Sequence, residues 1–129
     1  MGECASVIID LVATLLMESE EKFDWTMAAY EENRFADSIY HAYSVFVSAA
    51  KALLLDKSVS ASTQSGVIDK FQEHFVMTGD ISLGDKSFQE MVLQINQHEP
   101  SEAFAKSYVA DAQAFLNLAK AFREEAVAV

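Results

Sequence analysis

Residues that interrupt regular structure are scarce in this 129-residue chain, which holds one proline and four glycines. Long elements with few connections follow from that scarcity, and in a chain of this length such elements are helices. The single cysteine, Cys4, excludes an intramolecular disulfide and is typical of a protein in a reducing cytoplasm. No histidine lies near Cys4 in the sequence, so we expect a bystander or a small buried hydrophobe rather than a nucleophile.

Positive charge is also scarce, because nine Lys and Arg residues face 20 Asp and Glu residues and the net charge is −11. An acidic surface repels polyanions, so we do not expect nucleic-acid binding. Residues 1–32 hold one base, Lys22, among eight acids: Glu3, Asp10, Glu18, Glu20, Glu21, Asp24, Glu31 and Glu32. This acidic segment is either a solvated helix face or a docking surface for a basic partner.

No apolar run is long enough to span a membrane. The longest, residues 5–17, is interrupted by Asp10 and falls short of the roughly 20 residues that a span needs. A secretory signal would begin with basic residues, and the N-terminus has none. The sequence therefore predicts a cytoplasmic protein with no membrane association.

Hydrophobic residues make up 51% of the chain, which is enough to build the core of one domain over residues 1–129 without metals or disulfides. Apolar residues recur every three or four positions, which predicts amphipathic helices. We expect them over residues 5–32, 35–55, 65–77, a short stretch ending at 96, and 101–126. Asn33 is expected to cap the second helix, Asp85 or Ser87 the short one and Ser101 the last, while Gly79 is expected to terminate the third.

The last helix carries a sustained apolar seam, formed by Phe104, Tyr108, Ala112, Phe115, Ala119, Phe122 and Ala126. A seam with this spacing predicts packing at about 20° to neighbouring helices. Short connections between long helices favour antiparallel neighbours. We therefore expect an all-α fold, an antiparallel up-and-down four-helix bundle with a short fifth helix.

Signatures of catalytic and metal sites are missing from the sequence. A di-iron bundle needs an acid three residues before each histidine, but Ser38, Phe71 and Ile95 hold those positions before the three histidines. No GxGxxG, no P-loop and no Cys/His zinc spacing occurs. We therefore expect no catalytic residues, no metal and no cofactor.

The best candidates for a ligand site lie near the first helical hairpin. Arg34 and His41 are seven residues apart, so both project from one helix face, where Arg could hold a phosphate and His act as acid or base. Alternatively, Arg34 simply begins a helix and His41 packs against Tyr40 and Tyr43. Aromatic residues are frequent here, as core or as the lining of a pocket: Trp25, Tyr30, Tyr40, Tyr43 and Phe46. The candidate ligand-binding residues are Arg34, Tyr40, His41 and Tyr43.

A family resemblance is carried by the second predicted helix and the segment after it. Residues 43–55, YSVFVSAAKALLL, resemble the Tyr-Tyr-Ala-x-Phe-x-Ala-Ala-Lys-Ala-Leu-Leu helix of HEPN (higher eukaryotes and prokaryotes nucleotide-binding) domains. The family often continues with Gly-Val, Phe and Phe-Val-x-x-Gly, and this chain has Gly66-Val67, Phe71 and Phe75-Val76-Met77-Thr78-Gly79. The resemblance is close over residues 35–79 and extends to the rest through the helix pattern.

The resemblance implies a helical bundle, often a homodimer, in a family that includes RNase toxins and non-catalytic modules thought to bind nucleotides. The RNase members carry an Arg followed a few residues later by a His, late in the bundle. Arg34 and His41 match that spacing but stand at the start of the second helix, and Gln64 replaces a frequent loop histidine. We therefore expect a non-catalytic HEPN-like module for nucleotide or small-ligand binding or for protein association. The alternative is an RNase or nucleotidyltransferase-associated toxin that uses Arg34 and His41.

The N-terminus adds a weaker resemblance. Gly2-Glu3-Cys4 leads into a helix without preamble and is similar to the junction before HEPN-like tails of sulfite/nitrite reductase-type proteins. This implies an accessory domain of a parent redox enzyme. A purely structural bundle, without any pocket where polar groups converge, is the third possibility.

Overall fold

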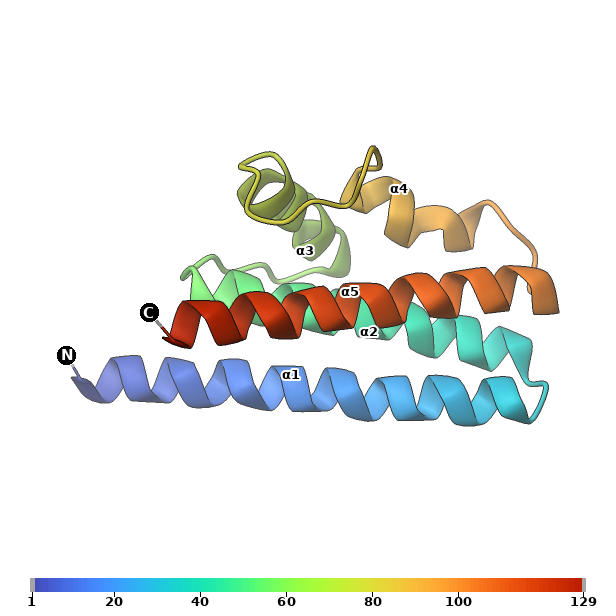
Figure 1. Cartoon of the computed structure of the whole chain (residues 1–129), viewed down its shortest axis with the longest axis horizontal. Coiled ribbons are helices and arrows are strands. Elements are labelled where there is room, and N and C mark those ends of the chain that lie inside the picture. The colour runs from blue at the N-terminus through green and yellow to red at the C-terminus, as the bar shows by residue number, and fades with distance from the viewer. Residues whose placement is uncertain (1, 129) are drawn as a thin grey trace.

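The protein folds as an all-α bundle in the computed structural model, which describes the backbone of residues 2–128 and the side chains of residues 7–125. The long helices α1 (Gly2–Glu31), α2 (Phe35–Asp56) and α5 (Glu102–Ala128) lie along the long axis of the molecule (Figure 1). α2 and α5 run in one direction and α1 runs in the other (Figure 1). The expected all-α bundle is confirmed. The side chain of Cys4 lies outside the described residues.

Shorter segments form a second layer above α2 and α5 (Figure 1). Helix α3 (Gln64–Phe71) continues into the π-helical turn η1 (Gln72–Val76), and α4 (Phe88–Val92) continues into the 3₁₀ turn η2 (Leu93–Asn96). They correspond to the predicted third helix and to the predicted short helix. Because this layer carries the chain back along the bundle, α5 begins at the same end of the molecule as α2 (Figure 1).

Most helix ends follow the predicted capping chemistry. Ser87 caps α4 in a reciprocal capping box with Glu90, and the Ser101 hydroxyl accepts a hydrogen bond from the backbone N–H of Phe104 at 3.1 Å. Gly79 has a φ of +84°, the left-handed backbone conformation that commonly ends a helix. The expected cap at Asn33 is wrong, because Asn33 ends α1 and the residue that precedes α2 is Arg34. The φ of Asn33 is +61°, and the N–H that follows it donates to the carbonyl of Ala29 at 2.8 Å.

Aromatic side chains from both layers meet in the centre of the molecule. The members are almost fully buried, come from α2, α3, η1, α4 and α5, and are Phe46, Phe71, Phe75, Phe88, Tyr108 and Phe115. Neighbouring ring centroids lie 4.4–6.3 Å apart, the range in which tilted and edge-on aromatic pairs attract. The predicted seam of α5 thus faces this cluster, with Ala126 outside the described side chains.

Small polar residues line the contact between α1 and α2. The hydroxyl of Ser19 donates to the hydroxyl of Ser48 at 2.8 Å, and the hydroxyl of Ser38 donates to the carbonyl of Thr26 at 2.9 Å. All four residues are buried, and among the described side chains no buried polar atom lacks a hydrogen-bond partner. Small side chains let helix backbones approach closely, and α1 and α2 share the most extensive helix contact in the bundle.

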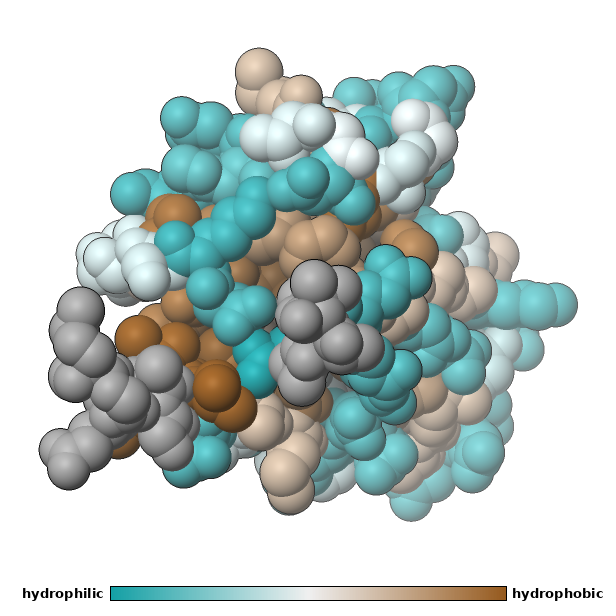
Figure 2. Space-filling view, turned by 60° about the vertical axis from the view of Figure 1, so that its left-hand side comes forward, coloured by the Kyte–Doolittle hydropathy of each residue, from teal (hydrophilic) through white to brown (hydrophobic). Residues whose placement is uncertain are grey.

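Apolar side chains are exposed on the first half of α1. Val7, Ile9 and Leu11 are about half exposed, and Met17 is 69% exposed. Figure 2, which looks toward the end where α1 begins and α5 ends, shows apolar surface bordered by hydrophilic residues.

α2 is long and apolar enough to cross a membrane by length and composition alone. In this structure it is a core helix, with 61% of its most apolar 18-residue window buried in the bundle.

The buried hydroxyl of Tyr108 predicts a loss of stability at alkaline pH. It donates to the carbonyl of Val92 at 2.7 Å, and burial raises its pKa, with smaller contributions from the neighbouring Tyr43 and Asp111. Above pH 10, the ordinary tyrosine pKa, the unfolded chain releases this proton while the folded chain retains it. Stability contributed by Tyr108 is therefore complete below pH 10 and is lost as pH rises further. Urea unfolding at increasing pH measures this, and a Tyr108→Phe variant that lost stability as steeply as the native chain would contradict it.

Candidate functional site

A cleft of about 250 Å³ lies between α1, α2 and the start of α3. We call it the α1/α2 cleft. α1 contributes Leu15, Glu18 and Lys22, and α2 contributes Ser44, Val47, Ser48 and Lys51. The segment that leads into α3 closes the third side with Ala61, Ser62, Thr63, Gln64 and Val67. Polar groups from three parts of the chain therefore converge on one hollow.

Two lysines supply positive charge to the α1/α2 cleft. Within the described side chains, Lys22 and Lys51 form no ion pair, whereas Lys57, Lys120 and Arg123 are each paired with a carboxylate. Glu18 also lines the cleft, so two ammonium groups and one carboxylate give it a formal charge of +1 in a chain with a net charge of −11. Such a pair of lysines attracts an anion, because it has no internal partner to give up.

The start of α3 is held in place by local hydrogen bonds. The hydroxyl of Thr63 accepts from the backbone N–H of Gly66 at 3.0 Å and so caps the helix. A Cβ at Gly66 would stand 2.9 Å from that hydroxyl, so the glycine makes room for the cap. Tyr43 donates its phenolic hydrogen to the side-chain oxygen of Gln64 at 3.2 Å, which ties this wall of the cleft to α2.

An exposed aromatic group adjoins the α1/α2 cleft. Trp25 is 48% exposed, Tyr40 is 63% exposed and His41 is half-buried. His41 lies edge-on to both other rings, with centroids 5.9 Å from Trp25 and 6.1 Å from Tyr40. We call these three residues the aromatic rim. Trp25 follows Lys22 by three residues, so the rim lies about one helical turn, roughly 4.5 Å, along α1 from that lysine.

The structure places three of the four candidate residues near the cleft. Tyr40 and His41 belong to the aromatic rim, and Tyr43 contacts Gln64 at the cleft wall. Burial raises the pKa of Tyr43, with a smaller contribution from Tyr40, so its hydroxyl stays protonated. The expected packing of His41 against Tyr40 is present, while its other aromatic neighbour is Trp25.

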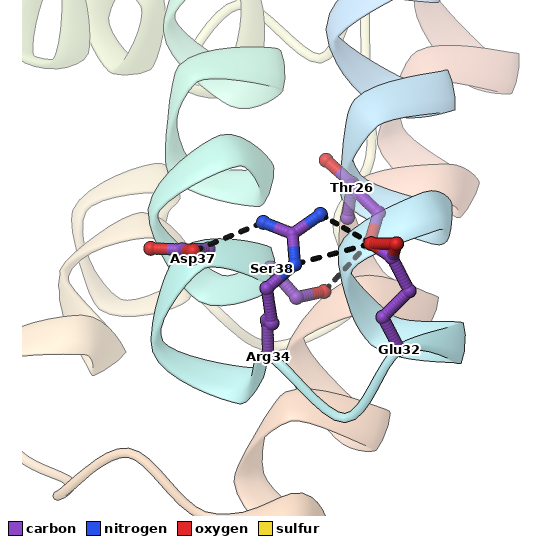
Figure 3. Close-up of polar contacts among 5 residues, drawn as sticks. All are labelled: Thr26, Glu32, Arg34, Asp37 and Ser38. Carbon is purple, nitrogen blue, oxygen red and sulfur yellow. Dashed lines mark hydrogen bonds and ion pairs between the residues drawn. The ribbon is translucent and has the colours of Figure 1, made fainter.

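Arg34 lies in a separate carboxylate clamp at the start of α2 (Figure 3). Its guanidinium donates to Glu32 at 2.6 and 3.1 Å and to Asp37 at 3.0 Å. The hydrogen bonds that Arg34 donates to Glu32 and to Asp37 raise its pKa. The hydrogen bonds of Arg34 therefore go to acids, and His41 is packed between aromatic rings, so no described contact joins the two residues.

Sequence reasoning missed Lys22, Lys51 and Thr63. Lys51 stands inside the helix that carries the family resemblance, and Lys22 is the single base in an acidic segment, but neither fact places them together. Their proximity depends on the register between α1 and α2. Among the described residues, no three His, Cys, Asp or Glu side chains converge so that they could hold a metal ion.

Comparison with known proteins shows a relative but assigns no activity. No family model matches the chain. It is similar to a UPF0332 protein of Pyrococcus horikoshii, with 41% identity over 63 residues. The match covers 49% of this chain and 44% of the relative, so the chain aligns with less than half of that protein's length. The relative's name states no substrate or partner.

Proposed function

We propose that the chain is a non-catalytic module that binds a nucleotide, or a similar small phosphorylated ligand, in the α1/α2 cleft. The observation that carries this proposal is the placement of two lysines without ion-pair partners one helical turn from an exposed aromatic rim. Ammonium groups bind phosphate, and exposed aromatic rings stack on bases for about 1–3 kcal/mol each. The site offers ammonium groups and exposed aromatic rings at a spacing that suits one nucleotide.

The dimensions and charge favour a single nucleotide over a polymer. A cleft of about 250 Å³ lies below the roughly 300–1,000 Å³ of sites that enclose a drug-sized ligand. The phosphate would therefore occupy the cleft between Lys22, Lys51 and the start of α3, with the base lying outside on the aromatic rim. A polynucleotide would extend over the acidic remainder of the surface and be repelled.

The RNase alternative gains no support from the arrangement of its two residues. Arg34 would have to leave both Glu32 and Asp37 before it could hold a phosphate. His41 lacks a described carboxylate or backbone partner that would orient it as a general base. We therefore assign binding, and not cleavage, to the site.

The wider context is proposed on the sequence resemblance. We propose a HEPN-like domain that forms a homodimer, resides in the cytoplasm and serves as an accessory domain, with a sulfite/nitrite reductase-type parent as one setting. Support comes from residues 43–55 and from the similarity to the UPF0332 protein. Light scattering of the purified chain tests the dimer, and the reading frame around the gene tests the parent enzyme.

Nucleotide binding is expected to change the fluorescence of Trp25, the single tryptophan of the chain, because the base would stack on its indole. The double variant Lys22→Ala/Lys51→Ala is expected to bind AMP or ATP about 10–100-fold more weakly, since each ammonium–phosphate contact contributes roughly 1 kcal/mol or more. Titration of the fluorescence with each nucleotide measures both effects.

The matched control for that experiment is Lys70→Ala/Lys106→Ala, which removes the same charge from two exposed lysines away from the cleft. It is expected to change the affinity less than threefold at moderate salt. Equal losses in both double variants would show attraction to net charge alone. If the fluorescence of the native chain does not change with AMP or with ATP, the proposal is wrong.

A further inference from the structure

A second groove runs between α1 and α5 and uses a different set of α1 residues. It consists of two hollows of about 220 and 180 Å³. Ala13, Leu16 and Met17 line the first, which is mainly apolar, and Phe23 and Leu116 line the second together with the polar residues Asp24, Gln113 and Asn117. Both hollows are also lined by Glu20 and Lys120, so these two residues lie where the hollows meet. We call the whole feature the α1/α5 groove.

The centre of the α1/α5 groove is bridged by one ion pair. The ammonium of Lys120 lies 3.4 Å from the carboxylate of Glu20, and both side chains are 40–49% exposed. A pair with this exposure and length contributes little to stability. A cation brought in by another molecule can therefore compete with Lys120 for Glu20 at little cost.

The border of the groove is acidic. Glu21 and Asp24 are exposed on α1 beside Met17 and Glu20 and form no ion pair with any described side chain. Between these acids and the first hollow stands Met17, an unbranched side chain that is 69% exposed and adapts its shape to a partner. A mainly apolar first hollow, the apolar Phe23 and Leu116 in the second and a negatively charged border are together complementary to an apolar stripe flanked by Lys and Arg.

We propose that the α1/α5 groove binds a basic amphipathic helix of another protein. The two hollows are centred on residues 16–17 and 23–24, seven residues or about 10.5 Å apart along α1. A bound helix therefore carries two apolar anchors seven positions apart, with a Lys or Arg between them that takes Glu20 from Lys120. The remaining bases of the helix face Glu21 and Asp24.

The test uses the full chain and a synthetic, fluorescently labelled helix with two leucines seven positions apart, lysines between and beside them, and alanines elsewhere. Anisotropy is expected to show saturable binding. In Glu20→Gln/Asp24→Asn the affinity is expected to fall at least tenfold, whereas Glu73→Gln/Asp85→Asn, with the same charge change away from the groove, loses less than threefold. A matched peptide with glutamates in place of the lysines is expected not to bind.

Three results would overturn the proposal. One is no binding of the basic peptide. Another is an equal loss in both double variants, which would mean unspecific charge attraction. The last is a native chain that is dimeric by light scattering and becomes monomeric in Met17→Lys, which would make a second copy the occupant. The Lys22→Ala/Lys51→Ala variant should bind the peptide normally, so failure here is separate from failure of nucleotide binding.

Discussion

Replacing Phe71 by alanine is expected to lower the free energy of unfolding by about 3–5 kcal/mol. Its ring is fully buried and lies 4.4 Å from that of Phe88, 4.9 Å from Phe75 and 5.2 Å from Phe115. Removing it leaves a cavity where α3, α4 and α5 meet, and the rigid helices around it cannot collapse to fill the space. Domains of this size are stable by roughly 5–15 kcal/mol, so the loss is a large fraction of the total.

Thermal unfolding followed by circular dichroism measures the loss of Phe71 as a fall of about 10–20 °C in Tm. Met77→Ala, a 73% exposed side chain of the same layer, is the matched control and should shift Tm by less than about 2 °C. Because α3 closes one side of the α1/α2 cleft, Phe71→Ala should also weaken nucleotide binding at temperatures where the chain is still folded. A variant as stable as the native chain would show that the aromatic cluster is not the core.

Breaking the pair between Arg123 and Asp56 is expected to cost about 2–3 kcal/mol from either side. Their closest nitrogen and oxygen are 2.6 Å apart, and the Arg123 side chain is 11% exposed. Asp56 is the last residue of α2, where a negative charge opposes the helix dipole unless a cation neutralises it. Without Asp56, a nearly buried guanidinium has no counter-charge. Without Arg123, a carboxylate stands unpaired at the helix end that disfavours negative charge.

A double-mutant cycle with Asp56→Leu and Arg123→Met isolates this interaction. The double variant is expected to be destabilised by about 1 kcal/mol or less, because two apolar side chains of similar size leave no unpaired charge. Urea unfolding of the four proteins gives the coupling free energy. Destabilisations that simply add in the double variant would show that the two charges act independently.

Local sequence signals predicted the helices because each signal acts within a few residues. The capping serines Ser87 and Ser101 and the seam of α5 depend only on short-range spacing, and the structure has them as expected. Asn33 shows where such reasoning is ambiguous, because an Asn between two helices can end the first or cap the second. The left-handed backbone of Asn33 and the hydrogen bonds from this segment back to α1 show that it ends the first helix.

The π-helical turn η1 was not predictable from spacing. It ends with the N–H of Met77 bonded to the carbonyl of Gln72 five residues earlier at 2.9 Å, while the carbonyl of His74 accepts from Lys57 at 2.6 Å. The same Lys57 ammonium stands 4.1 Å from the centre of the Phe75 ring. These stabilising contacts come from Lys57 at the end of α2. The spacing of apolar residues within the segment 64–77 carries no information about them, so it could not predict the π-helical turn.

The candidate site was predicted only in part for a similar reason. Tyr40, His41 and Tyr43 were found because they share a helix, whereas Lys22 and Lys51 meet only through the register of two helices. The seven-residue spacing of Arg34 and His41 suggested a pair, but Glu32 and Asp37 are nearer along the chain and hold the guanidinium. Arg34 therefore pairs with these nearby acids and not with His41, which lies two helical turns away.

The serine contacts between α1 and α2 have a consequence for how this protein could diversify. Since hydroxyls of Ser19 and Ser48 are bonded directly beneath the α1/α2 cleft, its two helical walls cannot separate without breaking buried polar contacts. Selectivity for ligands of other sizes would therefore have to arise in the segment 61–64, which forms the third wall and tolerates insertions as loops do. Homologues that accept bulkier molecules should differ in length there while keeping small residues along the helical contact.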